Sequence, residues 1–277
     1  MATVDVLQVA EILREVAETE ILPRWRNLAA HEVTRKTGEG AGLVTIADHA
    51  AELALAARLA ALLPGSIVVG EEAVAADPAV LQRFRSDEAI WVVDPIDGTR
   101  RFAEGSTVFD VMVALVVGGK PVAGWILAPA EDTLYLGEPG NGAEMRSPQG
   151  HKPLHACHDL SLAAMEGILG ANAFLSRGLP DPSRARHAFA AFVKHQCAGH
   201  NYGRLFQGHS HFLINFSTYP WDHLPGLAIA TAAGFHAARH DGRPFDPLDR
   251  HGGILVAPDA ESWDKIHKAL LAGNEPA

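Results

Sequence analysis

A short apolar segment that runs into acidic and turn-forming residues constrains the fold of this chain more than any other feature. Residues 90–99 read Ile-Trp-Val-Val-Asp-Pro-Ile-Asp-Gly-Thr, which predicts a buried strand followed by a tight turn. Asp94 and Asp97 lie three residues apart across that turn, so both carboxylates can face one small volume. Two carboxylates at such a short distance repel each other, and a bound divalent cation commonly offsets this repulsion. Gly98 and Thr99 then offer backbone N–H groups and a hydroxyl to a phosphate, so the segment predicts a metal-dependent phosphate site.

Helices and strands are expected to alternate along the rest of the chain. Thr45 is the expected N-cap of a long Ala-rich helix, with Asp48 at the capping-box position. Helices are predicted over 4–22, 45–63, 78–86, 183–194, 201–207, 221–233 and 259–271, and strands over 66–70, 90–94, 109–117, 122–128, 133–136, 143–146, 195–198, 209–216 and 253–257. This order indicates layered α/β or α+β packing. The Gly- and Pro-rich stretch 137–153 is the best candidate boundary between two halves, 1–150 and 151–277.

Composition and charge narrow the class of protein. The 277 residues carry a formal net charge of −10 and no run of Lys or Arg, which argues against nucleic acid as a main partner. The two cysteines, Cys157 and Cys197, imply no disulfide framework and are expected to be inert thiols, and the 15 histidines form no zinc-binding pattern. No apolar run reaches membrane-spanning length and the first residues lack a basic leader region, so we expect a cytoplasmic enzyme without a membrane partner.

Four acidic residues share one kind of setting. Glu71 follows a predicted strand, Asp94 ends one, Asp97 lies in the turn after it, and Asp222 opens a helix. Residues at strand ends and helix starts can be aimed at one cleft. Three or four carboxylates with one turn carbonyl could hold two or three Mg²⁺ ions, which together clamp the entering and leaving oxygens of a phosphoryl transfer. Glu72 is the alternative to Glu71 as a ligand.

These motifs together resemble the inositol monophosphatase family of lithium-sensitive, Mg²⁺-dependent phosphatases. The resemblance rests on Gly70-Glu71-Glu72, on Trp91 to Thr99, and on Trp221-Asp222 about 120 residues later, with Lys36 and Val44 to Asp48 upstream. It covers about residues 5–260. It implies a layered αβαβα sandwich, a metal cleft between the two halves, a homodimer and a small phosphorylated metabolite as substrate.

The resemblance also assigns roles to individual residues. Glu71, Asp94 and the Ile96 carbonyl would hold a first metal, Asp94, Asp97 and Asp222 a second, and a third ion would sit near Glu71. Thr99, hydrogen-bonded to Asp48, would orient the attacking water, with Glu71 as a further catalytic residue. The N–H groups of Gly98 and Thr99 would bind phosphate, and Asp97, Asn215 and Asp222 would contact the substrate. On the residues alone, the alternatives are that Asp48 is no more than a helix N-terminal charge and that Thr99 is no more than a turn-closing hydroxyl.

The departures from the family pattern fall on the substrate side. Arg101 replaces an Asn of the family motif, and Asn215 replaces an acid seven positions before Asp222. The segments 198–202 and 232–235 also differ from the family's substrate-pocket sequences. We therefore expect retained hydrolysis with an altered alcohol half of the substrate. Candidates are inositol phosphate, histidinol phosphate, a sugar phosphate or 3′-phosphoadenosine 5′-phosphate. The rival hypothesis is a non-catalytic regulator that keeps the fold and binds metal or ligand.

Overall fold

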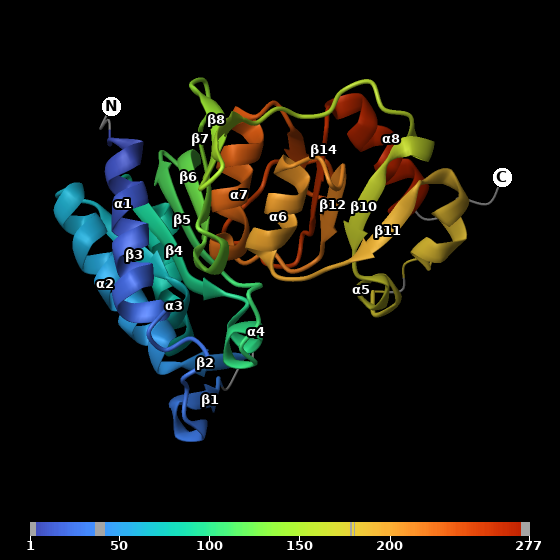
Figure 1. The fold of residues 1–277 in the computed structure, drawn as a ribbon. Helices are drawn as coiled ribbons and strands as arrows, with labels where there is room; N and C mark the ends of the chain where they lie inside the picture. The colour runs from blue at the N-terminus through green and yellow to red at the C-terminus, as the bar shows by residue number, and fades with distance from the viewer. Residues whose placement is uncertain (1–3, 37–41, 178, 180, 273–277) are drawn as a thin grey trace.

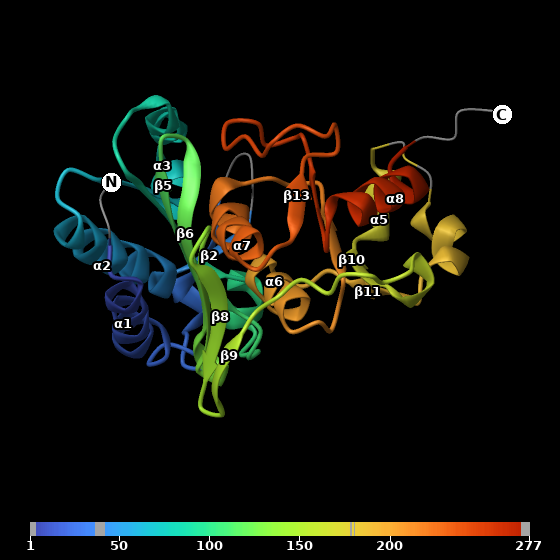
Figure 2. The ribbon, with the colours of Figure 1, turned by 90° about the horizontal axis from the view of Figure 1, so that it is seen from above.

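Five layers of secondary structure make up the molecule. The computed structural model describes residues 4–36, 42–177, 179 and 181–272. Figures 1 and 2 show an outer helical layer, a large sheet, an inner helical layer, a smaller sheet and a final helical layer, in that order. The predicted layered αβαβα sandwich is therefore confirmed.

The larger sheet has seven strands in the spatial order β3-β4-β5-β6-β7-β8-β9. Their bounds are β3 Ile67–Gly70, β4 Ile90–Asp97, β5 Asp110–Val117, β6 Lys120–Ala128, β7 Thr133–Glu138, β8 Gly142–Ser147 and β9 Gly150–Pro153. β3 runs parallel to β4, and every later neighbour is antiparallel. The Gly118-Gly119 turn joins β5 to β6, as predicted, with Val117 opposite Lys120.

Both faces of the central strands β4 and β5 are buried, which explains why these strands read as continuous apolar runs. In β4, Trp91 and Val93 pack with α1 (Val6–Val16) and α2 (Ile46–Leu62), whereas Val92 points to the opposite face. α1 continues into a π-helical turn at Ala17–Ile21. The inner helices α6 (Ala198–Phe206) and α7 (Pro220–Ala232) cover the opposite face. This second face brings α7, with its acidic first turn, close to the end of β4.

The smaller sheet has five strands in the order β11-β10-β12-β14-β13. Their bounds are β10 Glu166–Leu169, β11 Ala191–Lys194, β12 Phe212–Asn215, β13 His236–Ala238 and β14 Ile254–Ala257. Phe212 and Leu255 on its outer face pack against Trp263 of α8 (Ala260–Leu270), and the short α5 (Ala171–Leu175) lies on the same side. Alternate residues such as Leu213 face α6 and α7, so this sheet also has two buried faces.

Several predicted elements differ from the structure. The predicted helix 183–194 is a 3₁₀ segment at Pro182–Ala188 followed by strand β11, because β11 pairs in parallel with β10. The predicted strand 195–198 is absent, since α6 begins at Ala198. The segment 78–85 is 3₁₀ rather than α-helical. Short elements were also not predicted: β1 Val33–Arg35, β2 Leu43–Thr45, α3 Glu71–Ala76 and α4 Thr99–Ala103.

The division into halves 1–150 and 151–277 stays a prediction. The expected absence of a leader concerns in part residues 1–3, which lie outside the described part of the chain, as do residues 273–277. Among the described residues, no helix is both long and apolar enough to cross a membrane.

Candidate metal centre

The end of β4 carries two acidic side chains that a regular strand would point to opposite faces. Residues three apart alternate across a sheet, but the pairing of β4 with β5 shifts register between Asp94 and Asp97. Pro95 lies within this irregularity and has no N–H to pair. Asp94 Oδ1 accepts a hydrogen bond from the Ile96 N–H at 3.1 Å. The local bend therefore brings both carboxylates to one side.

Asp222 reaches the same place from the first turn of α7. Pro220 occupies the first position of that helix, where its missing N–H costs nothing, and Trp221 stacks on the Tyr219 ring at 5.2 Å between ring centroids. Carboxylate oxygens of Asp94, Asp97 and Asp222 all lie within 4.8 Å of one another. Three of the four acids that the sequence singled out are thus brought together by elements more than 120 residues apart.

Glu71 lies at the start of α3, outside this tight group. Its charge still raises the pKa values of Asp94 and Asp222, after the larger effect of burial. Lys36 Nζ lies 2.6 Å from Glu71 Oε1 and 2.6 Å from Glu72 Oε1. Of the two glutamates, Glu72 is the more buried, with 5% of its side chain exposed against 22% for Glu71. Lys36 therefore pairs with both acids beside the aspartates, and its single positive charge offsets one of their two negative charges.

The electrostatics of the aspartate group favour a bound cation. Burial, followed by the charges of Glu71 and the other two aspartates, raises the pKa of Asp94 well above its usual range. Burial raises the pKa of Asp97 to about 7, with Asp110 adding to the effect and the Gly199 N–H, 2.6 Å from Asp97 Oδ2, opposing it. The donors are carboxylate oxygens, with the Ile96 carbonyl nearby, and an all-oxygen set suits a hard ion such as Mg²⁺.

Thr99 and Asp48 lie beside the aspartates and contact each other as the resemblance implied. Thr99 Oγ1 is 3.0 Å from Asp48 Oδ1 and 3.0 Å from the Ile96 carbonyl. The other oxygen of Asp48 accepts from the Thr45 N–H at 2.8 Å, which confirms the predicted capping box. Burial raises the pKa of Asp48 to about 7, against these hydrogen bonds. Asp48 therefore holds Thr99 as well as capping α2.

Gly98 shapes the turn between β4 and α4. Its φ of +88° lies in the left-handed region that favours glycine. An added Cβ would lie 3.1 Å from the Val108 carbonyl oxygen and 3.2 Å from Cys197 Cβ. The backbone at this turn is thus fixed both by its own conformation and by close neighbours.

The remaining substrate-side residues have other surroundings. Asn215 ends β12, is half-buried, and accepts from the Ser217 N–H at 3.2 Å. His223 follows Asp222, but its ring nitrogens face the Tyr202 hydroxyl at 3.1 Å and the Ser217 carbonyl at 2.8 Å. Burial lowers the pKa of His223 to about 4, so this ring is a neutral core group.

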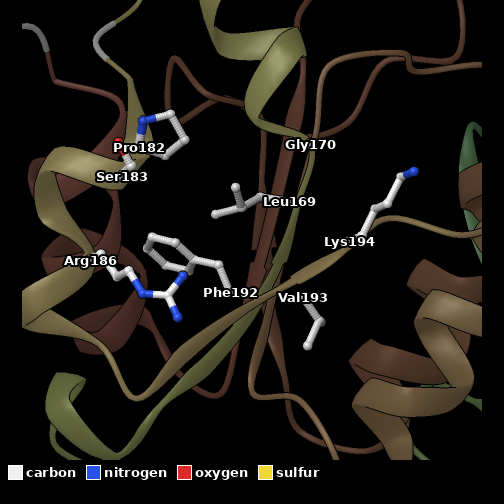
Figure 3. A pocket seen from close by; sticks show the side chains of 8 residues that line it. All are labelled: Leu169, Gly170, Pro182, Ser183, Arg186, Phe192, Val193 and Lys194. Carbon is white, nitrogen blue, oxygen red and sulfur yellow. The ribbon is translucent and has the colours of Figure 1, made fainter.

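A pocket of about 380 Å³ lies elsewhere, at the edge of the smaller sheet. Figure 3 shows Leu169 and Phe192 inside it, with Arg186 and Lys194 extending from different segments. None of its lining residues belongs to the acidic group, so it is separate from the candidate centre.

Glu52 is a positioning residue that the sequence analysis missed. Its carboxylate accepts hydrogen bonds from the N–H groups of Glu72 at 2.7 Å and Ala73 at 2.8 Å, and so caps α3. Gly70 leaves the space for it, because an added Cβ would overlap that carboxylate. The signal was present in the sequence: Glu52 lies four residues after Asp48, on the same face of one helix.

Comparisons with known proteins identify relatives of this chain. A model of the inositol monophosphatase family matches residues 4–274. The probable inositol 1-monophosphatase ImpA of Mycobacterium tuberculosis is 31% identical over 250 residues, which cover 87% of this chain and 84% of that protein. Inositol-1-monophosphatase SuhB of the same species is 34% identical over 161 residues, 54% of each chain, so this match spans about half the length of that relative.

The fold has close counterparts among solved structures. The IMPase TM1415 of Thermotoga maritima superimposes with a TM-score of 0.78 over 95% of this chain and 94% of that one, at 22% identity. This similarity concerns the fold alone. Together with the family match over nearly the whole described chain, it leads to one conclusion: the protein belongs to the inositol monophosphatase family.

Proposed function

We propose that this chain is a phosphatase that hydrolyses a small phosphate monoester with the help of Mg²⁺. The observation that carries the proposal is the meeting of Asp94, Asp97 and Asp222 within 4.8 Å, in a chain of this family. The first two come from the larger sheet and the third from the helical layer beside it, so only the folded chain assembles them. Buried carboxylates this close together are costly unless a cation or protons neutralise them.

The proposed ligands are Glu71, Asp94, the Ile96 carbonyl, Asp97 and Asp222, holding two or three ions. Mg²⁺ bound by such ligands neutralises phosphate charge and lowers the pKa of water at the site. Glu71 lies in an ion pair with Lys36, so it joins the ligand set by exchanging that contact for a metal ion. Lys36 would then remain paired with Glu72, 2.6 Å away.

The chain's own residues position the reactants. When Thr99 donates its hydroxyl proton to Asp48, its oxygen is left to accept a hydrogen bond from the attacking water. Asp48 is held in place by the hydrogen bonds that cap α2, which keeps an acceptor in position for the Thr99 hydroxyl. The N–H groups of Gly98 and Thr99, at the start of α4, are proposed to bind the phosphate oxygens. Positioning and charge neutralisation are the two effects that phosphoryl transfer needs most.

The part of the site that binds the alcohol half of the substrate is proposed to be altered relative to the family pattern. Asn215 stands where the family resemblance implies an acid. A carboxylate that would accept a hydrogen bond from a substrate hydroxyl is therefore replaced by an amide, which can both donate and accept. Inositol phosphate, histidinol phosphate, sugar phosphates and 3′-phosphoadenosine 5′-phosphate are the candidates. Inhibition by lithium, a homodimeric state and a cytoplasmic location belong to the same proposal.

Phosphate release from these candidates, with and without Mg²⁺, tests the proposal. We expect turnover of at least one candidate that disappears when the metal is chelated. Asp222→Asn should abolish it, whereas the matched surface substitution Asp87→Asn should not, because Asp87 is exposed. Calorimetric binding of a candidate without any hydrolysis, in protein with Mg²⁺ bound, would instead support the non-catalytic regulator and refute the phosphatase.

A further inference from the structure

A second group of metal-binding side chains lies outside the proposed Mg²⁺ ligands. Asp110 is the first residue of β5, Cys197 is the N-cap of α6, and His200 lies in the first turn of that helix. His200 Nδ1 is 2.6 Å from Asp110 Oδ2, and Cys197 Sγ is 3.4 Å from the same oxygen. One donor atom from each residue lies within 4.8 Å of the other two. The three come from β5 and the start of α6, which pack against each other.

These three side chains are largely buried, but one of them remains accessible to solvent. Asp110 is 1% exposed and Cys197 is 7% exposed, so neither is a surface group. The side chain of His200 is 16% exposed and provides the route from solvent. Asp110 is an acid whose ion-pair partner is this one half-buried histidine. A buried acid with such a partner is a site where added positive charge is favourable.

The donor chemistry distinguishes this group from the aspartate centre. Sulfur, imidazole nitrogen and carboxylate oxygen suit a borderline-soft ion such as Zn²⁺, whereas Mg²⁺ prefers oxygen alone. Tetrahedral Zn²⁺ with ordinary bond lengths places its donor atoms roughly 3.4–3.6 Å apart. The 3.4 Å separation of Cys197 Sγ and Asp110 Oδ2 already fits. The 2.6 Å contact of His200 with Asp110 is a hydrogen bond, which lengthens once its proton leaves.

We propose that Asp110, Cys197 and His200 form a second, mixed-donor cation site that binds Zn²⁺ or an ion of the same class. The site does not depend on the proposed phosphatase activity. The three residues leave the fourth position of a tetrahedral ion to water, on the exposed side of His200.

Binding at this site exchanges protons for the ion. The Cys197 thiol loses its proton to solvent, and the His200 ring presents an unprotonated Nδ1 while its proton resides on Nε2. The ion thus replaces the hydrogen bond that now joins His200 Nδ1 to Asp110 Oδ2 at 2.6 Å.

The site adjoins the aspartate centre: Asp110 is the cross-strand partner of Asp97, and the Cys197 side chain and the Ala198 N–H also hydrogen-bond Asp97. Gly199 lies between Cys197 and His200 and donates its N–H to Asp97 Oδ2 at 2.6 Å. An added Cβ at Gly199 would lie 2.6 Å from the Asp110 side chain, so α6 approaches β5 as closely as glycine allows. An ion held by the flanking residues therefore fixes the turn that contacts Asp97.

Cobalt spectroscopy of the full chain in excess Mg²⁺ tests the proposal. Co²⁺ reports its own ligands, and a charge-transfer band from thiolate to cobalt arises only when a cysteine sulfur binds the ion. We expect this band, with one Co²⁺ per chain that Zn²⁺ displaces. Excess Mg²⁺ competes with cobalt for the all-oxygen centre. Any cobalt that still binds there has no sulfur ligand and gives no thiolate band.

Variants assign the band to its ligands. Cys197→Ser should remove it and His200→Asn should weaken cobalt binding at least tenfold, while Cys157→Ser, which removes the exposed cysteine, should leave it unchanged. Absence of the band in the wild-type chain, or its persistence in Cys197→Ser, would overturn the proposal.

Thermal unfolding gives a second readout that does not depend on spectroscopy. Zn²⁺ should raise the unfolding midpoint of the Mg²⁺-saturated wild type and of Cys157→Ser, because binding to the native state alone stabilises it. The same addition should leave the midpoint of Cys197→Ser and of His200→Asn nearly unchanged. An equal rise in all four proteins would place the ion elsewhere and refute the site.

Discussion

Replacing Asp97 by asparagine should have opposite effects on the stability and on the activity of this protein. In the metal-free chain, Asp97 is a buried anion beside the buried carboxylate of Asp94 and the half-buried carboxylate of Asp222. Asparagine removes that charge and keeps an oxygen that can accept from the Gly199 N–H. Its amide can also donate to Asp94 or Asp222. The variant should therefore be more stable than the wild type without metal, and should bind Mg²⁺ more weakly.

The size of the effect follows from the pKa of Asp97. Burial raises this pKa from its ordinary value near 4 to about 7. Each tenfold change in acidity corresponds to about 1.4 kcal/mol, so the ionised side chain costs the metal-free native state about 4 kcal/mol. A raised acid pKa means that the native state binds the proton more tightly than the unfolded chain. Stability is therefore lost as pH rises from about 4 to about 7, and the loss is complete above pH 7.

Thermal unfolding in the presence of a chelator measures this directly. At pH 8, Asp97→Asn should unfold roughly 10 °C above the wild type, since about 1 kcal/mol corresponds to a few degrees for a chain of this size. At pH 4, the two proteins should differ little. Asp87→Asn, which changes an exposed aspartate, is the control and should follow the wild type at both pH values.

Adding Mg²⁺ should then reduce the difference in unfolding midpoint between the two proteins. The free energy of unfolding of the wild type rises by about 2.7 kcal/mol at a metal concentration a hundred times its Kd, and that of the variant rises by less. Turnover by the variant should be nearly abolished. A variant that is less stable than the wild type at pH 8 without metal, or that keeps full turnover, would refute the electrostatic account.

Three further substitutions or conditions probe the neighbouring residues. Thr99→Ala should lower kcat roughly a hundredfold or more with little change in KM. Thr99→Ser keeps the hydroxyl and should retain most of the wild-type kcat. Equal activity of the two variants would exclude the orienting role. Gly98→Ala should lower the unfolding midpoint by an amount that corresponds to about 1–3 kcal/mol, because φ at this residue is +88°, and an unchanged midpoint would contradict the strain argument. Millimolar Li⁺ should inhibit phosphate release in competition with Mg²⁺, and indifference to Li⁺ in a titration would argue against the proposed metal sites.

Much of the fold could be predicted because its signals are local. The Thr45 and Asp48 side chains form the capping box that the sequence indicated, and α2 ends at Leu62, before Pro64-Gly65. The glycine turn between β5 and β6 fixes a hairpin through neighbouring residues alone. The run at residues 90–99 predicted both a buried strand and two convergent acids, and the register shift after Asp94 supplies the geometry.

What could not be predicted depends on contacts between distant segments. Residues 191–194 became strand β11 only because β10, more than 20 positions earlier, offers a parallel edge. Cys197 gave no sequence signal beyond an isolated thiol, since its neighbour Asp110 lies 87 residues away and the spacing matches no metal motif. The surroundings of Glu71 were equally hidden, because its ion pair with Lys36 joins two segments 35 residues apart.

Diffraction from crystals of the protein grown with Mn²⁺ and phosphate tests the central claim most directly. Mn²⁺ prefers the same oxygen donors as Mg²⁺, and its anomalous signal locates each ion without reference to activity. We predict ions between Asp94, Asp97 and Asp222, with phosphate beside Gly98 and Thr99. Ions bound only at other residues, with these three aspartates uncoordinated, would contradict the account.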